Sequence, residues 1–146
     1  QKFLDSYDYR PCRAEPLHAI ARFLRMNGRP RAAYLFAKEA AQLPYPQQDI
    51  LFIDTNVYKW MALDELAATA FFTHDFKIGY SACETLLKQS RLPESEVERV
   101  QKNHAAYLEK VKEVDALTQK LAKDTKMPPL APVLNTKQHT FKKRRK

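Results

Sequence analysis

Apolar side chains in the first part of the chain recur at the three-and-four spacing that places them on one face of a helix. From Glu15 to Met26 they lie one helical turn apart, which predicts a first helix with Pro16 in its first turn. Asn27-Gly28 is a left-handed stop signal, and Pro30 opens a second helix. Because only about three residues connect the two helices, they must fold back as an antiparallel hairpin.

The same spacing predicts which side chains of this hairpin face inward. The first helix is expected to turn inward Leu17, Ile20, Ala21, Phe23, Leu24 and Met26. The second is expected to turn inward Ala33, Leu35, Phe36, Ala37, Ala40 and Leu43 before Pro44-Tyr45-Pro46 ends it. Residues 1–14 lack such a pattern and Pro11 forbids a helix through its position, so this segment is expected to be irregular.

A second hairpin is predicted after a link at residues 47–56. Its helices run from about 56 to 72 and from about 76 to 89, with a turn at 73–75. The apolar cluster at 50–53 in the link is expected to dock on the first hairpin.

Laying the second hairpin on the first at an offset of 46 residues pairs similar side chains. The pairs are Leu17 with Leu63, Ala21 with Ala67, Leu24 with Ala70, Ala33 with Gly79, Ala37 with Cys83, and Ala40 with Leu86. Small residues recur where two helices must approach closely. This pattern predicts stacked antiparallel helical hairpins that cover one another's apolar faces, loosely like tetratricopeptide repeats.

Residues 93–124 predict a single long helix. Its apolar stripe follows a heptad spacing through Val97, Val100, His104, Tyr107, Val111, Val114, Thr118 and Leu121. About 30 residues span roughly 45 Å, which exceeds what two hairpins need as a lid. The first half is therefore expected to pack on the hairpins and the second half to project, where it could form a dimer.

Almost all of the net charge of +8 lies at the C-terminal end. Residues 1–92 contribute +2, residues 93–124 contribute −1, and residues 125–146 contribute +7. This tail has no packing face and is expected to be disordered. Its final basic run consists of Lys142, Lys143, Arg144, Arg145 and Lys146. Such a run contacts nucleic acid or another polyanion without sequence preference, or serves only as a solubilising terminus.

The composition argues against an enzyme and against a bound cofactor or metal. Only two glycines, Gly28 and Gly79, are present, so no glycine-rich phosphate loop can form. The four histidines and two cysteines share no metal-ligand spacing. Asp64 and Glu65 are adjacent on a helix and point about 100° apart, so they cannot easily converge on a substrate. No apolar run is long enough to cross a bilayer, and a reducing, cytoplasmic location is expected.

A set of polar and aromatic residues near the predicted loops is the candidate site. It comprises Arg10, Arg13, Glu15, Asp49, Tyr58, Trp60 and Glu65. In one interpretation these residues are structural, with Arg13 and Glu15, or Arg10 and Asp49, holding the N-terminal segment to the inter-hairpin link. In the other they form a ligand or peptide groove with aromatic walls and an arginine for an anionic group.

Several strings of the chain match one known pattern. They are Tyr9-Arg10-Pro11-Cys12-Arg13-Ala14-Glu15-Pro16-Leu17, Ala33-Tyr34-Leu35-Phe36-Ala37, Pro44-Tyr45-Pro46, Val57-Tyr58-Lys59-Trp60 and Asp64-Glu65-Leu66. Residues 7–108 resemble the tetratricopeptide-like region that follows family-2-like glycosyltransferase domains in bacterial and viral proteins. The resemblance implies an appendage that positions an acceptor or a protein partner for a transferase domain in the same parent chain. It does not extend to the projecting part of the long helix or to the basic tail.

Taken together, these patterns predict an all-α, non-catalytic chain in three parts. Residues 1–92 form two helical hairpins, 93–124 a capping and projecting helix, and 125–146 a basic tail. The predicted function is protein interaction or acceptor positioning beside a glycosyltransferase. The alternative is an adaptor that binds a polyanion through its tail.

Overall fold

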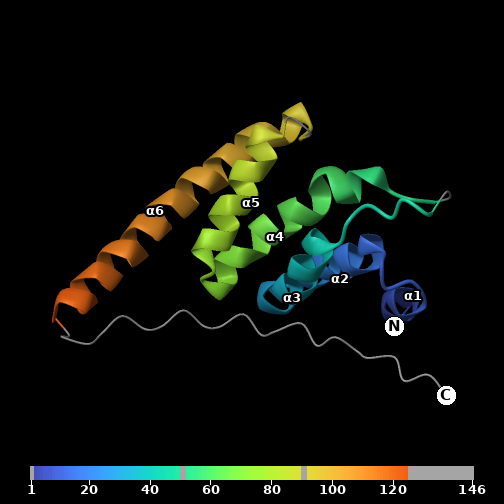
Figure 1. Ribbon diagram of the computed structural model, residues 1–146, viewed down its shortest axis with the longest axis horizontal. Helices are drawn as coiled ribbons and strands as arrows, with labels where there is room; N and C mark the ends of the chain where they lie inside the picture. Colours follow the sequence, from blue (N-terminus) through green and yellow to red (C-terminus); the bar gives the residue numbers. More distant parts are fainter. Residues whose placement is uncertain (1, 50–51, 90–91, 125–146) are drawn as a thin grey trace, which may run out of the picture.

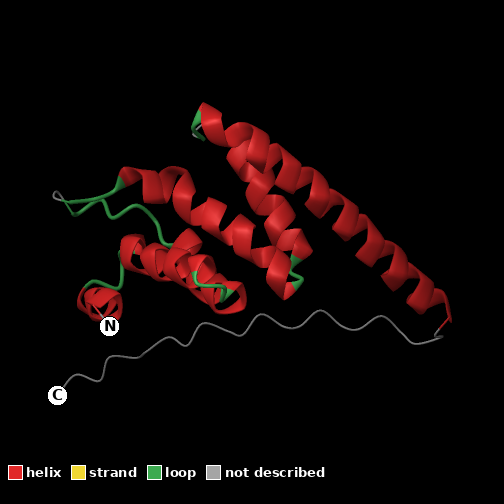
Figure 2. Ribbon diagram, turned by 180° about the vertical axis from the view of Figure 1, so that it is seen from behind, coloured by secondary structure: helices red, strands yellow, loops and turns green. Residues whose placement is uncertain are grey.

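The computed structural model describes residues 2–49, 52–89 and 92–124, and these residues form helices joined by turns and one longer link (Figures 1 and 2). The elements in chain order are α1 (Lys2–Tyr9), α2 (Ala14–Met26), α3 (Pro30–Gln42), η1 (Val57–Met61), α4 (Ala62–Ala70), η2 (Phe71–Thr73), α5 (Phe76–Lys88) and α6 (Glu94–Asp124). No strand occurs among the described residues. The all-helical prediction is therefore confirmed.

The turn between α2 and α3 follows the expected chemistry. Gly28 has a φ of +71°, and the Arg29 amide donates a 2.9 Å hydrogen bond to the Leu24 carbonyl. The Asn27 side chain donates to the Phe23 carbonyl at 2.7 Å. These bonds satisfy carbonyls that the end of a helix leaves unpaired, so α2 stops here and α3 starts at Pro30.

The predicted helix over residues 56–72 is present, but it changes pitch along its length. It opens with a π-helical turn, η1, continues as α4 and closes with a 3-10 turn, η2. The side chain of Asp54 accepts a 3.0 Å hydrogen bond from the Asn56 amide and so helps to start this helix. The next helix, α5, begins after His74 takes a left-handed conformation with a φ of 61°.

Helices that are neighbours in the chain are neighbours in space from α2 to α6, as Figure 1 shows. At the core the side chains are small, which lets the helix axes approach closely. Of the six residue pairs related by the offset of 46, four are buried at both positions. These are Ala21 with Ala67, Ala33 with Gly79, Ala37 with Cys83, and Ala40 with Leu86.

Gly79 lies at a tight contact between α5 and α6. A Cβ atom at this position would lie 2.1 Å from Cζ of Tyr107, whose ring crosses from α6. The Tyr107 hydroxyl donates a 2.6 Å hydrogen bond to the Ala67 carbonyl of α4. One tyrosine of α6 thus packs on α5 and bonds to α4, and this contact positions the first half of α6.

Several expectations from the sequence were wrong. Residues 1–14 are not wholly irregular, because Lys2–Tyr9 forms α1, which ends two residues before Pro11 and packs against α2. Leu35 does not face inward but is 68% exposed. The inner face of α3 is centred on Ala33 and Ala37, and a residue two positions away from each points to the opposite side of the helix.

Two apolar residues near the C-terminal end of α2 were also wrongly expected to face inward. Phe23 and Met26 are 62% and 68% exposed, because the buried face of α2 runs through Leu17 and Ala21. Phe52 does not dock on the first hairpin, since it is 93% exposed. The neighbouring positions 50 and 51 lie outside the described residues.

The long helix α6 changes its surroundings along its length. Val100 and Tyr107 are buried, whereas Val114, Leu117 and Leu121 are 39%, 60% and 63% exposed. In Figure 1 this second half extends away from the other helices. The basic run at 142–146 lies outside the described residues.

Candidate functional site

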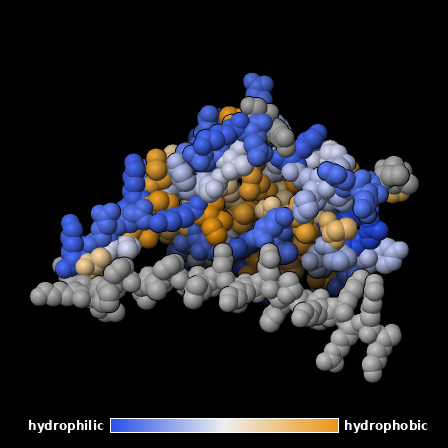
Figure 3. Space-filling model, viewed as in Figure 1, coloured by the Kyte–Doolittle hydropathy of each residue, from blue (hydrophilic) through white to orange (hydrophobic). Residues whose placement is uncertain are grey.

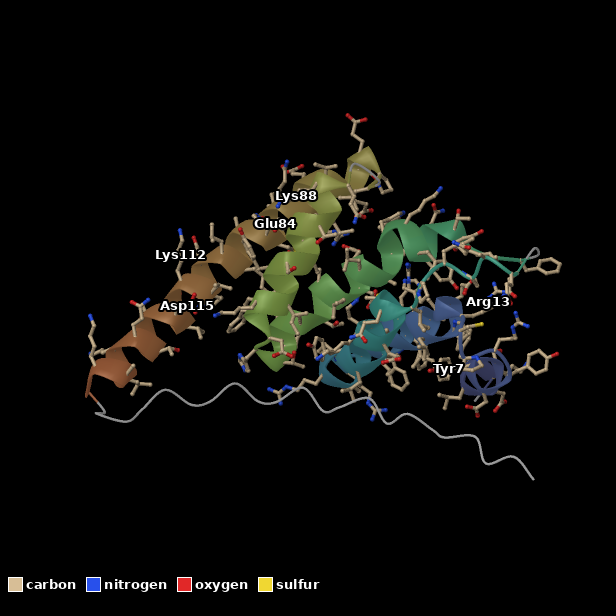
Figure 4. All side chains as sticks on the ribbon, viewed as in Figure 1. Tyr7, Arg13, Glu84, Lys88, Lys112 and Asp115 are labelled. Atoms are coloured by element: carbon tan, nitrogen blue, oxygen red, sulfur yellow. The ribbon has the colours of Figure 1, made fainter. Side chains whose placement is uncertain are left out.

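The residues of the candidate set belong to two separate places in the fold. Arg10, Arg13, Glu15, Asp49 and Tyr58 come together where α1, α2 and the inter-hairpin link meet, and Figure 4 shows Arg13 at this junction. We call this cluster the N-terminal clamp. The other two, Trp60 and Glu65, line a groove on α4.

Arg13 is the centre of the N-terminal clamp. Its guanidinium donates to Glu15 at 2.5 Å and to the carbonyl of Phe52 at 2.6 Å, and it lies 3.7 Å from the Asp49 carboxylate. Arg10 donates to the same Asp49 carboxylate. The two arginines therefore hold the link that follows α3 against the start of α2.

Tyr58, on the π-helical turn η1, completes the clamp. Its hydroxyl donates a 2.5 Å hydrogen bond to Glu15 and accepts one from the Ala14 amide at 3.0 Å. Burial, and then the bond to Glu15, raise the pKa of Tyr58 to about 12. Burial alone would raise the pKa of the Glu15 carboxyl, but the bonds from Arg13 and Tyr58 outweigh it and that pKa is lowered. Glu15 is thus ionised and fully bonded at neutral pH, as a structural group is.

The groove lies between α2, α4 and the first turns of α6 and has a volume of about 240 Å³. We call it the arginine groove. Its lining residues are His18, Arg22, Arg25, Trp60, Met61, Asp64, Glu65, Ala68, Glu96 and Arg99. Three arginines and three carboxylates face it, so the groove is strongly polar but has no net charge when His18 is neutral.

Arginines from two different helices bind the adjacent carboxylates of α4. Arg25 of α2 holds Glu65 with two bonds, of 2.5 and 3.1 Å. Arg99 of α6 holds both oxygens of Asp64 at 3.0 Å. Asp64 and Glu65 both line the groove, but they bond to arginines of different helices, so each ties α4 to a different neighbour.

The pKa values of these groups reflect their burial. Glu65 is 4% exposed, and its hydrogen bond raises the pKa of Arg25. Burial raises the pKa of Asp64 even though Arg99 opposes the shift. Both arginines remain charged, so the ion pairs fix the walls of the groove at neutral pH.

Two residues of α2 that line the arginine groove, His18 and Arg22, differ from Arg25 and Arg99, which are held by carboxylates. His18 is 7% exposed, and burial lowers its pKa, with Glu65 opposing and Arg22 adding to the shift. Arg22 is exposed and makes no ion pair with the residues that the structure describes. Arg22 is therefore the cation of the groove that is available to a ligand.

Sequence reasoning found only two of the residues that line the arginine groove. The missed groups follow a helical spacing that was present in the sequence, because His18, Arg22 and Arg25 lie at i, i+4 and i+7 on α2. That signal is a polar stripe beside an apolar one. A search restricted to apolar periodicity passes over it.

Two of the remaining reactive side chains, His104 and Cys83, pack against other parts of the fold. His104 stacks on Tyr80 with ring centroids 4.5 Å apart. Cys83 is buried, and burial raises its pKa to about 11, so its thiol is protonated at neutral pH. Cys12 is exposed.

No protein-family model, curated protein or solved structure matches the chain. Among helices of the described residues, none combines the length and apolar character that a bilayer crossing requires.

Proposed function

We propose that the chain is a non-catalytic helical-repeat module that binds an extended segment of another protein in the arginine groove. The proposal treats α2–α3 and α4–α5 as two tetratricopeptide-like hairpins, capped by α6. The burial of equivalent small residues at the offset of 46 supports this view. In such a stack the first helix of each hairpin lines one shared groove, and α2 and α4 line the arginine groove here.

The observation that carries the proposal is that Arg22 forms no ion pair within residues 2–49, 52–89 and 92–124, whereas the two arginines beside it are held by carboxylates. Arg25 and Arg99 are fixed by Glu65 and Asp64 and shape the groove without offering free charge. Arg22 can therefore take one carboxylate of a ligand, either an acidic side chain or a chain terminus. Trp60 and Met61 offer an apolar wall for a neighbouring ligand side chain.

Trp60 makes this proposal directly testable, because it is the single tryptophan of the chain. We would titrate the protein with a pool of synthetic peptides that carry an acidic residue next to a leucine, and follow the intrinsic fluorescence of Trp60. Saturable quenching that Arg22→Ala weakens about tenfold or more is expected, since a charge-assisted bond contributes about 1.5–3 kcal/mol.

A matched control is Arg29→Ala. Arg29 is an exposed arginine in the α2–α3 turn, outside the arginine groove, so its removal changes the net charge equally. An equal loss of affinity in Arg29→Ala would assign the binding to overall charge and overturn the groove proposal. A pool that leaves Trp60 fluorescence unchanged would do the same.

The sequence resemblance of residues 7–108 supports a narrower proposal, in which the bound partner is a glycosyltransferase domain or its glycosyl acceptor. In a family-2-like transferase joined to this chain, replacing Arg22 by alanine should lower kcat/KM for the acceptor through a higher KM at unchanged kcat. Uniform binding of the acceptor, and not the chemical step, is what the groove would contribute.

The charge distribution supports a second candidate function, binding of a polyanion by the tail. Residues 125–146 contain seven basic and no acidic residues. A salt titration of heparin or double-stranded DNA binding, with the full chain and with a chain ending at Lys123, separates the two candidates. Polyanion binding should need the tail, weaken steeply with salt and show no sequence preference.

A further inference from the structure

His18 is a buried polar side chain of the arginine groove, and it forms no hydrogen bond within residues 2–49, 52–89 and 92–124. It lines the groove from α2, yet only 7% of it is exposed. Native proteins pair most buried polar groups, because burial without a hydrogen bond is costly. Among the described residues, Nε2 of His104 is the one side-chain nitrogen or oxygen that is sealed from solvent without a partner. The ring nitrogens of His18 are therefore open to the groove, where a ligand can bond to them.

The carboxylates of the groove are not available to His18 as bonding partners. Each is bonded to an arginine, in the pairs Glu65 with Arg25, Asp64 with Arg99, and Glu96 with Arg99. Of the seven titratable side chains that line the groove, His18 and Arg22 are the two without such a bond in the part of the chain that the structure describes. They lie four residues apart on α2, a spacing that makes side chains neighbours on one helix face, with Cβ atoms about 5–6 Å apart. One carboxylate can therefore bond to both.

The surroundings of His18 suit a charged group better than an apolar one. Figure 3 shows apolar atoms on the α5 and α6 side of the molecule. In the arginine groove, by contrast, only Trp60, Met61 and Ala68 of the ten lining residues are apolar. An anionic group of a ligand finds hydrogen-bond donors here, and Trp60 lines the same groove and can report its binding.

Charged groups on several elements decide how readily His18 takes up a proton. Those that face it or share its groove are Arg22 and Arg25 of α2, Asp54 of the link, Asp64 and Glu65 of α4, and Glu96 and Arg99 of α6. Burial is the main cause that lowers the pKa of His18, and Arg22 lowers it further, whereas Glu65 opposes the shift. A carboxylate that binds to Arg22 cancels the repulsion between Arg22 and a protonated His18.

We propose that the carboxylate of the bound segment lies between His18 and Arg22, and that His18 takes up a proton as this carboxylate binds. The inference rests on the proposed function and adds to it a second binding residue and a dependence on pH. In the free protein His18 is neutral at about pH 7.5, because its pKa lies below its usual 6.5. Since binding takes up a proton, affinity rises as the pH falls. A carboxylate of the ligand stays ionised down to about pH 5.5, because its own pKa is about 4.

Trp60 fluorescence titrations of the full chain at about pH 7.5 and about pH 5.5 test the proposal, with two peptides that each carry one carboxylate. The first is an acetylated and amidated glycine-leucine-glutamate-glycine peptide, whose carboxylate is a side chain. The second is an acetylated glycine-glycine-leucine peptide, whose carboxylate is the chain terminus. The peptide that binds identifies the source of the carboxylate. Its affinity should be about three- to tenfold tighter at the lower pH, because a charge-assisted hydrogen bond is roughly twice as strong as a neutral one.

His18→Gln should remove most of this gain in affinity, because the glutamine amide cannot take up a proton in this range. The matched control, His74→Asn, removes an exposed imidazole outside the groove and should keep the gain. Asparagine tolerates the left-handed conformation that His74 adopts. Circular dichroism at both pH values checks that each variant is folded.

A second measurement needs no variant. Calorimetric titration of the wild type at about pH 6, in two buffers with different enthalpies of ionisation, measures the protons that binding takes up. Uptake of a fraction of a proton for each bound peptide is expected. Binding without proton uptake overturns the proposal.

Three results of the fluorescence titrations also overturn it. One is a wild-type affinity that is equal at both pH values. Another is a gain that His18→Gln retains, since it would then belong to Asp64, whose pKa burial raises. The third is an equal loss of the gain in His74→Asn. Binding at about pH 7.5 that requires Arg22 but does not change with pH would reject the role of His18 and leave the proposed function standing.

Discussion

Replacing Gly79 by alanine should destabilise the protein, although a glycine inside a helix is normally a weak point. In an unobstructed helix interior this substitution stabilises by about 1 kcal/mol, because alanine has the higher helix propensity. Gly79 is buried in α5, where the ring of Tyr107 occupies the space that a side chain would need. Packing and helix propensity therefore predict changes in stability of opposite sign.

The geometry decides the sign. The added Cβ would lie 2.1 Å from Cζ, 2.3 Å from Cε1 and 2.6 Å from the hydroxyl oxygen of Tyr107. Tyr107 is 2% exposed and its hydroxyl is bonded to Ala67, so the ring cannot move away without losing that bond. Overpacking costs about 1–3 kcal/mol and the lost buried bond about 1–3 kcal/mol more. After subtracting the gain in propensity, a net loss of about 1–5 kcal/mol is expected.

The measurement is the free energy of unfolding in urea, followed by far-UV circular dichroism, in a double-mutant cycle with Tyr107→Leu. Leucine is shorter than tyrosine and has no hydroxyl to anchor. In that background the same Gly79→Ala substitution should be neutral or stabilising, by up to about 1 kcal/mol. The change of sign between the two backgrounds is specific to this contact.

The reasoning would be refuted by a Gly79→Ala variant that is more stable than the wild type. An equal loss in both backgrounds would also refute it, because the loss would then have a cause other than Tyr107. Circular dichroism of the folded variants is the control for intact helix content.

Three further substitutions test the clamp and the ion pairs of the groove. Arg13→Ala should lower stability by about 1–3 kcal/mol, because Glu15 and the Phe52 carbonyl lose a donor and Asp49 loses an ion-pair contact, and Trp60 fluorescence titrations should be unchanged; an altered titration would place Arg13 in the binding site. Arg25→Ala should cost about 3–5 kcal/mol by leaving Glu65 buried and unpaired, and Arg25→Ala/Glu65→Ala should recover part of it; additive losses would contradict this pairing. His18 has a folded-state pKa below its usual 6.5, so the unfolded chain takes up the proton first and stability should fall as pH drops below about 6.5. His18→Gln should flatten that decline in urea unfolding measured at about pH 7.5 and about pH 5.5, and an unchanged slope would rule out His18 as its source.

The helix boundaries were predictable because strong local signals set them. Asn27-Gly28 and Pro30 define one turn almost without reference to the rest of the molecule. α1 was missed for the opposite reason. None of its residues is buried, although Tyr7 packs partly against the core, so its contact with α2 had to be known before the helix could be predicted.

The outward position of Leu35 shows a second limit of periodicity. A stripe of apolar residues indicates one buried face, yet Leu35 is apolar and lies on the other side of α3. The buried residues of α3 are Tyr34 and three alanines, which are less hydrophobic than leucine but allow close helix contact. Where helices approach closely, side-chain size decides the buried face and hydrophobicity alone does not.

The contacts of the N-terminal clamp and those of the arginine groove could not be predicted equally well from the sequence. The contacts of Arg13 with Glu15 and of Arg10 with Asp49 were offered as one interpretation because these polar residues flank the predicted loops, whereas Tyr58 was not expected to join them. For the arginine groove, helix geometry places the adjacent Asp64 and Glu65 about 100° apart around α4. Their partners, Arg99 and Arg25, lie 35 and 40 residues away in the chain. Which arginine meets which carboxylate depends on how far each helix slides along the next. For Arg99 and Asp64, the same two helices are also joined by the hydrogen bond from the Tyr107 hydroxyl to the Ala67 carbonyl. A packing contact that contains none of the charges of the groove therefore helps to bring Arg99 to Asp64.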